Sequence, residues 1–178
     1  MSSWQQYISD PENLNNIIAG VAVGISFIST LLALWSVYLQ RKHNQISIKP
    51  LPDIIFGDYT NEIKVALHNH GLGPMVLTKV EILKDGVVLD DNLISLMPEQ
   101  PKGIDWDDFV ELLKDRILAP GEEKMLVKLT GNPKNKTYGK FRDKVREELA
   151  PLSVKIYYKG IYDKEETIFE KELDWFRR

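Results

Sequence analysis

The chain has 178 residues, of which 28% are charged, and a formal net charge of −3 at pH 7. It contains no cysteine, which excludes disulfides, thiolate metal sites and a cysteine nucleophile. Residues 46–178 are numerous enough to fold as one domain with its own core, and the chain is not charged enough to be a disordered polyelectrolyte.

An uncharged run at residues 17–39 is followed almost at once by Arg41, Lys42 and His43. As a helix this run rises about 34 Å, enough to cross a hydrocarbon core of about 30 Å. No Lys or Arg precedes it, which is typical of a retained anchor rather than of a cleaved signal peptide. Basic residues directly after the span predict a single-pass protein of the inner (plasma) membrane, with its N-terminus outside and its C-terminal domain in the cytoplasm.

The segment Asp10-Pro11-Glu12 predicts the start of this helix, with Asp10 as the N-cap and Pro11 at the first helical position. The helix should continue into the basic cluster, and Pro50 and Pro52 prevent it from going further. We therefore expect a short extracytoplasmic N-terminus at residues 1–16, a transmembrane helix at 17–39, a basic juxtamembrane linker at 40–52 and a soluble domain at 53–178.

The predicted span has two different faces. Small or polar residues recur at alternating steps of four and three, the period of a left-handed helical bundle, and such residues let helices approach closely. The pattern predicts a homo-oligomer. Gly20 and Gly24 offer a competing right-handed contact, and single spans are often rich in small residues without any partner. The predicted seam comprises Ala22, Ser26, Ser29, Ala33 and Ser36.

Short strand patterns separated by turn signals occupy most of the remaining chain. Apolar residues alternate in several of them, Asp85-Gly86 predicts a hairpin turn, and Pro120-Gly121 predicts another turn. Repeated short strands of this kind indicate a β-sandwich. The expected strands lie at residues 53–58, 62–69, 75–84, 87–89, 124–129, 152–158 and 167–173.

Two helices are predicted between these strands. Both show large apolar residues at intervals of three and four, which would place one face of each helix on the sheet. The first is expected to begin at Asp105, and the second to end before Pro151. The apolar positions are Trp106, Phe109, Leu113 and Ile117 in the first helix, and Tyr138, Phe141, Val145 and Leu149 in the second.

Residues 69–74 read Asn-His-Gly-Leu-Gly-Pro and precede a predicted strand. This segment resembles the Asn-x-Gly-x-Gly-Pro-Ala pattern of bacterial single-pass membrane proteins that carry a cytoplasmic immunoglobulin-like domain, with Met75 in place of the alanine. The turn at residues 119–122 and the strand at 154–158 fit the later part of that pattern. The resemblance implies an immunoglobulin-like sandwich, here with two inserted helices, and says more about fold than about function.

No diagnostic catalytic motif is present, so we expect neither an enzyme nor a bound cofactor. His68 and His70 alternate on one predicted strand and share a face, as two metal ligands could, but no third ligand stands nearby. Surface or turn-supporting histidines are the alternative. Gly71 and Gly73 fit turn geometry better than phosphate binding, because a phosphate-loop lysine and a following helix start are absent.

Charge is unevenly distributed along the domain. Residues 85–123 hold 11 acids and 3 bases, whereas residues 124–159 hold 10 bases and 3 acids. The basic residues in and after the loop at 131–137 could hold the phosphates of a nucleotide messenger or anionic lipid headgroups. The alternative is a solvent-exposed helix face whose positive charge balances the negative charge of the acidic segment. The predicted anion-binding cluster comprises Lys134, Lys136, Lys140, Arg142, Lys144 and Arg146.

These patterns together predict a non-enzymatic, oligomeric membrane effector or sensor whose cytoplasmic domain binds an anionic ligand and signals to its transmembrane helices. The architecture is similar to membrane effectors of nucleotide-signalled phage defence, which implies a cyclic oligonucleotide as the ligand and a role in antiviral defence. The alternative is a passive membrane anchor or adaptor that recruits a soluble protein by strand addition or through its acidic face. Expected partners are the lipid bilayer, further copies of the chain, and an anionic small ligand or a protein, but not duplex nucleic acid.

Overall fold

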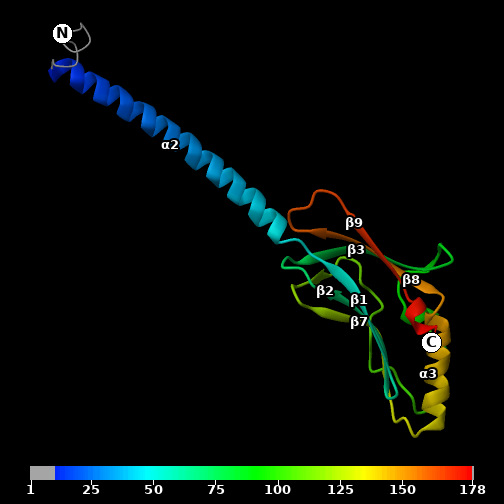
Figure 1. Ribbon diagram of the computed structural model, residues 1–178. Helices are drawn as coiled ribbons and strands as arrows, with labels where there is room; N and C mark the ends of the chain where they lie inside the picture. Colours follow the sequence, from blue (N-terminus) through cyan, green and yellow to red (C-terminus); the bar gives the residue numbers. More distant parts are fainter. Residues whose placement is uncertain (1–10, 178) are drawn as a thin grey trace. The chain divides into compact units, whose positions relative to one another are not determined.

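The computed structural model describes residues 11–177 as one long helix followed by a β-rich domain (Figure 1). Contacts divide the chain between Ile46 and Ser47. The coarse architecture predicted from the sequence, an N-terminal helix and a mainly β domain, is therefore confirmed.

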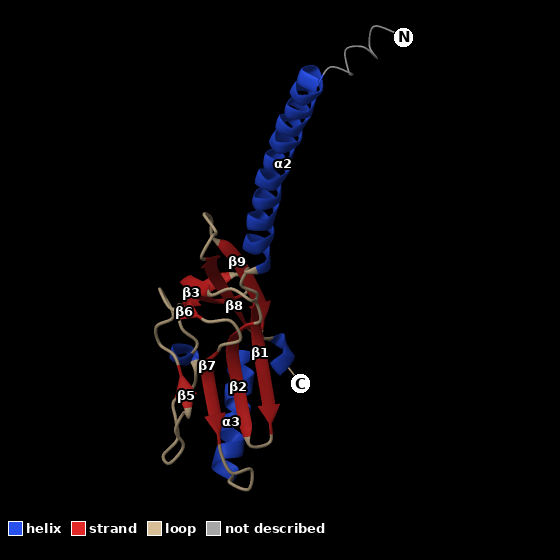
Figure 2. Cartoon of the chain, turned by 90° about the vertical axis from the view of Figure 1, so that its left-hand side faces the viewer, coloured by secondary structure: helices blue, strands red, loops and turns tan. Residues whose placement is uncertain are grey.

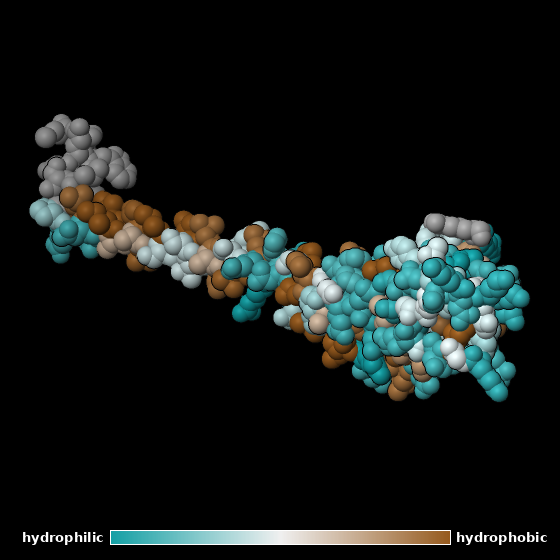
Figure 3. Space-filling model, turned by 90° about the horizontal axis from the view of Figure 1, so that it is seen from below, coloured by the Kyte–Doolittle hydropathy of each residue, from teal (hydrophilic) through white to brown (hydrophobic). Residues whose placement is uncertain are grey.

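The helix α2 (Pro11–Ser47) has 37 residues, with Pro11 at its first position and Glu12 in its first turn. The predicted cap, Asp10, lies outside the described residues. Among residues 11–177, α2 is the one helix long and apolar enough to cross a membrane, and none of its residues is buried. On the face seen in Figure 3, hydrophobic residues cover much of α2, whereas the domain is mostly hydrophilic. The helix ends three residues before Pro50, as the proline signal predicts.

Antiparallel strands build the domain, and they include all seven predicted from the sequence. Asp85 and Gly86 both have positive φ angles, 51° and 78°, as the predicted two-residue hairpin turn requires. Strands β5 and β6, of two residues each, were not predicted. The strands are β1 (Pro52–Tyr59), β2 (Glu62–Asn69), β3 (Met75–Lys84), β4 (Val87–Asp90), β5 (Asp108–Phe109), β6 (Ile117–Leu118), β7 (Glu123–Thr130), β8 (Leu152–Gly160) and β9 (Thr167–Glu172).

The strands form two sheets that share one apolar core. The first has the order β1-β2-β7-β5, and the second has the order β4-β3-β8-β9, with β6 also paired to β3. The helix α3 (Lys136–Leu149) connects β7 of the first sheet with β8 of the second (Figure 2). Buried side chains such as Val65, Leu129 and Val154 come from both sheets and pack with those of α3. Two short 3-10 helices complete the domain, η1 (Ile94–Leu96) and η2 (Asp174–Phe176).

The second predicted helix is confirmed as α3. Asn135 caps it, because its side-chain oxygen accepts hydrogen bonds from the backbone N–H groups of Thr137 and Tyr138. The helix ends at Leu149, before Pro151. Its buried residues are the four apolar positions expected from the sequence, Tyr138, Phe141, Val145 and Leu149.

The first predicted helix, beginning at Asp105, is wrong, and residues 48–177, as the structure describes them, contain one inserted α-helix rather than two. The segment contains β5, which pairs with β7, and β6, which pairs with β3. The Asp107 carboxylate accepts hydrogen bonds from the backbone and the hydroxyl of Thr130, and Asp115 has a φ of 61°, which interrupts a right-handed helix. Pairing with one strand of each sheet outweighs the local helical period, because helix propensity is a weak preference.

Truncating Leu149 to alanine tests the packing of α3 against the core. The side chain is fully buried, so Leu149→Ala should lower the free energy of unfolding by about 3 kcal/mol. The adjacent Glu148 is exposed, and Glu148→Ala should change it by no more than about 0.5 kcal/mol. Urea unfolding of the full chain in detergent, followed by tryptophan fluorescence, measures both. Equal stability of the two variants would contradict the placement of α3.

Candidate functional site

The Asn-x-Gly-x-Gly-Pro segment surrounds a buried side-chain amide. Asn69 is fully buried at the end of β2. Its side-chain oxygen accepts hydrogen bonds from the backbone N–H groups of Leu51 and Gly71, each at 3.1 Å. Its side-chain nitrogen donates to the carbonyl oxygen of Gly73 at 2.8 Å and to two carbonyl oxygens of residues 118–119 at 3.3 Å. One side chain thus joins the linker after α2 to two loops.

The two glycines of the segment are required by close backbone contact. A Cβ atom on Gly71 would lie 2.3 Å from the carbonyl oxygen of Lys49, and one on Gly73 would lie 1.8 Å from that of Ile48. Any side chain at either position would push the linker away. The glycines therefore pack against the linker, whereas the sequence suggested turn geometry as their role.

His68 and His70 lie on one face, as their alternation predicts, with ring centroids 4.0 Å apart. The Nε2 atom of His70 lies 3.8 Å from a carboxylate oxygen of Asp53 on the neighbouring strand. Within residues 11–177, no group of three or more histidine, cysteine or acidic side chains is arranged to hold a metal ion. The pair therefore has no third ligand in the part of the chain that the structure describes.

The predicted anion-binding cluster divides into arginines and lysines. Its two arginines form hydrogen bonds within the domain. The Nε and Nη2 atoms of Arg146 donate to the two carboxylate oxygens of Asp58, at 2.9 and 3.0 Å. The hydrogen bond to Asp58 raises the pKa of Arg146. Arg142 donates from Nη1 to the carbonyl oxygen of Tyr59 at 2.7 Å. Both arginines thus attach α3 to the end of β1.

The four lysines of the cluster are exposed to solvent. Lys136, Lys140 and Lys144 follow one another at steps of four, so they form a row along the exposed side of α3, and Lys134 precedes them in the loop. We call Lys136, Lys140 and Lys144 the lysine row. Among the described residues, none of the four has an ion-pair partner within 4.0 Å. Their charges are available to a ligand.

A shallow pocket of about 220 Å³ adjoins the lysine row. Lys140 and Lys144 line it together with Thr137, whose hydroxyl can donate a hydrogen bond, and Phe141. Glu99 and Pro101 complete the lining. The charges of Lys140 and Lys144 would attract an anionic group, whereas that of Glu99 would repel it. The sequence does not reveal this pocket, because its lining comes from two segments about 40 residues apart.

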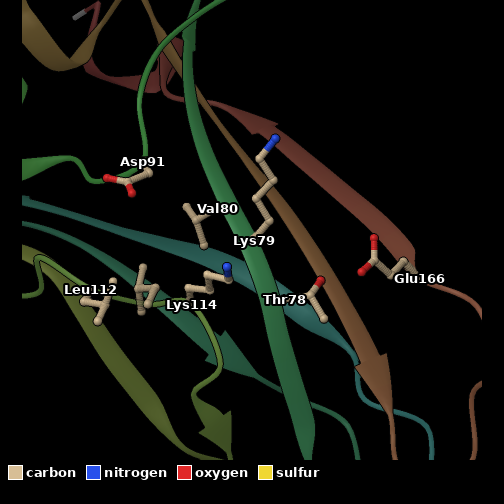
Figure 4. Close-up of a pocket in the computed structure, with 8 residues that line it drawn as sticks. Thr78, Lys79, Val80, Asp91, Leu112, Lys114 and Glu166 are labelled. Atoms are coloured by element: carbon tan, nitrogen blue, oxygen red, sulfur yellow. The ribbon is translucent and has the colours of Figure 1, made fainter.

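A larger pocket of about 370 Å³ lies over β3, and its walls come from residues 78–80, Asp91, 112–114 and Glu166 (Figure 4). Its charged groups are mixed in sign, and they do not converge on one point in Figure 4. The Lys79 amine lies 2.5 Å from a carboxylate oxygen of Glu81, and this hydrogen bond raises the pKa of Lys79. The pocket therefore lacks a set of polar groups directed at a single ligand atom.

The predicted seam on α2 lies on a continuous helix, and its side chains are exposed in the isolated chain. The Ser26 hydroxyl donates to the carbonyl oxygen of Ala22 at 2.8 Å, and the Thr30 hydroxyl donates to that of Ser26 at 2.9 Å. The Ser26 hydroxyl therefore has a partner within its own helix, and a lipid environment does not force it to bond to a second helix. The small size of the seam residues and the hydroxyls of Ser29 and Ser36 still support self-association.

No family model matches the chain, and no curated protein matches it.

Replacing Asn69 tests whether its amide holds the linker and the two loops together. Asn69→Ala leaves buried backbone donors and acceptors without partners, which should lower the free energy of unfolding by about 3 kcal/mol. The exposed neighbour His70 is a matched control, and His70→Ala should change this free energy by no more than about 0.5 kcal/mol. Urea titration of both variants measures the difference. An Asn69→Ala protein as stable as the control would show that the amide is dispensable.

The division of the basic cluster can be tested by comparing two substitutions on α3. Arg146→Ala removes the partner of a mostly buried Asp58 carboxylate and should lower the free energy of unfolding by about 2 kcal/mol. Lys144→Ala removes an exposed, unpaired charge and should leave the free energy of unfolding within about 0.5 kcal/mol of the parent value. Thermal unfolding followed by near-UV circular dichroism distinguishes them. An equal loss of stability in the two variants would contradict the distinction between paired arginines and unpaired lysines on α3.

Proposed function

We propose that the protein is a membrane-tethered receptor whose β domain binds an anionic ligand on the lysine row of α3. The observation that carries this proposal is the presence of three unpaired lysines one helical turn apart, beside a pocket that also contains the Thr137 hydroxyl. A phosphate group can accept hydrogen bonds from lysine amines and from a hydroxyl at the same time. A cyclic oligonucleotide carries two or more phosphates and belongs to this ligand class.

The proposal places α2 across the inner membrane with the domain in the cytoplasm. Its support is the length and apolar character of α2 and the basic residues Arg41, Lys42 and His43 directly after the uncharged run. Self-association along the Ala22 to Ser36 seam would bring several domains together and let ligand binding act on the helices. The relationship to immunoglobulin-like domains also belongs to this proposal, with two antiparallel sheets and the Asn69 segment as its support.

Ligand binding is tested with a cyclic dinucleotide and two triple variants of the full chain in nanodiscs. Replacing Lys136, Lys140 and Lys144 with glutamine should abolish measurable binding in isothermal titration calorimetry. Replacing three exposed lysines elsewhere, Lys84, Lys114 and Lys164, removes the same charge and should preserve binding.

Salt provides an independent control on the same measurement. Raising the ionic strength from about 0.1 M to about 1 M shortens the screening length from about 10 Å to about 3 Å, so binding to the lysine row should weaken. Equal binding by both triple variants would contradict the assignment of the site. If cyclic di- and trinucleotides do not bind the parent chain, cyclic oligonucleotides are excluded as its ligands.

A membrane adaptor is the second candidate, and the open edge strand β4 favours it. Val87, Val88 and Leu89 are all exposed on β4, and an apolar edge of this kind can pair with a strand of another protein. The edge strand β1 is less available, because its Ile54 and Tyr59 carbonyl oxygens accept from Lys171 and Arg142.

Replacing residues 17–39 with a polyleucine span distinguishes the two candidates. A receptor that signals through its seam should lose ligand-dependent dye leakage from liposomes, because polyleucine lacks the small and polar positions of the seam. An adaptor should keep its function, because it requires only attachment to the membrane. Ligand binding by the parent chain without any change in leakage would contradict signalling through the span.

A further inference from the structure

Exposed apolar side chains lie on the loops next to the linker that follows α2. Leu72 is 74% exposed at the centre of the loop at residues 71–74, and Ile161 and Tyr162 are each 55% exposed. Tight turns favour glycine, proline, asparagine, aspartate and serine, so turn chemistry does not account for leucine, isoleucine and tyrosine at loop tips. Leu51 in the linker itself is 60% exposed.

The turn that carries Ile161 and Tyr162 is closed by hydrogen bonds at its base. The backbone N–H of Asp163 donates to the carbonyl oxygen of Gly160 at 3.1 Å, and the Gly160 N–H donates to the Asp163 carboxylate at 2.9 Å. The two apolar residues therefore occupy the centre of a fixed turn, where burial in the domain's own core is not available to them.

Both loops lie against the linker. Gly71 and Gly73, on either side of Leu72, contact the backbone of Lys49 and Ile48, and a Cβ on Gly160 would lie 3.0 Å from the Cδ atom of Pro50. Met75, at the end of the first loop, also pairs directly with Gly160. The loop tips thus flank the segment through which the chain enters the domain.

We propose that Leu72, Ile161 and Tyr162 enter the headgroup region of the bilayer that α2 crosses, so that the domain docks on the lipid surface. This inference rests on the membrane anchor in the proposed function. The helix rises about 12 Å from Leu39, the last residue of the uncharged run, to its end at Ser47, and the interfacial layer is about 5–8 Å deep.

Covalent attachment therefore holds the linker and its flanking loops close to the lipid. The uncharged run is longer than a hydrocarbon core of about 30 Å, and such spans tilt, which shortens the remaining gap. Leucine and isoleucine gain free energy at the boundary between headgroups and acyl chains, and tyrosine prefers this depth because it has an apolar ring and a polar hydroxyl.

The absence of cysteine from the chain makes site-specific labelling direct. Leu72→Cys and the control Val87→Cys each receive one environment-sensitive fluorophore, and both full-length proteins are reconstituted into anionic vesicles. Val87 is a matched control because it is apolar and 62% exposed, and it lies beyond the far end of β3, about 30 Å along that strand from the loop of Leu72. Circular dichroism of the two variants verifies that both are folded.

The proposal predicts that emission at position 72 shifts to the blue and is quenched by nitroxide-labelled lipid. Emission at position 87 should instead be quenched by aqueous iodide. Equal iodide quenching at both positions, in protein that floats with the vesicles, would overturn docking and leave the anchor intact. A blue shift at position 72 without nitroxide quenching would also overturn it, because it would indicate a protein contact. Protein that does not float would disprove the anchor, and docking with it.

Discussion

The hydrogen bonds of the buried Asn69 amide hold the linker after α2 and the loop at residues 71–74 together. The amide gives a partner to the N–H of Leu51 in the linker, to the N–H of Gly71 and to the carbonyl oxygen of Gly73. A buried polar group without a partner is costly, so these segments must meet as they do for the fold to be stable. Contacts of the domain begin at Ser47, close to the start of the segment 46–178 that the sequence indicates as one domain.

The basic residues of α3 divide by type, and the chemistry of the two side chains accounts for the division. Arg146 presents a planar fork that matches the two oxygens of Asp58, which is a geometry that lysine cannot provide. Lysine amines are strongly hydrated point charges, and on α3 they remain in solvent. The arginines therefore hold the helix in place, and the lysines give its exposed side a positive charge.

The sequence predicts those parts of the structure whose signal is local. Strands such as β2 and β3 follow from alternating apolar residues, and the four buried positions of α3 follow from their spacing. The segment after Asp105 shows the limit, because its conformation depends on pairing with β7 and β3, which are distant in the chain. The candidate site has the same limit. Clustered positive charge is visible in the sequence, but the ion pair that occupies Arg146 joins residues 88 positions apart.

The linker after α2 is a fixed part of the domain, because the N–H of Leu51 donates to the buried side chain of Asn69. Hydrogen exchange of the full-length protein in nanodiscs tests this most directly. The amides of Leu51 and Gly71, which donate to Asn69, should exchange as slowly as those within β2. Exchange at Leu51 as fast as at the exposed turn of Asp85 and Gly86 would show a loose tether and contradict the claim.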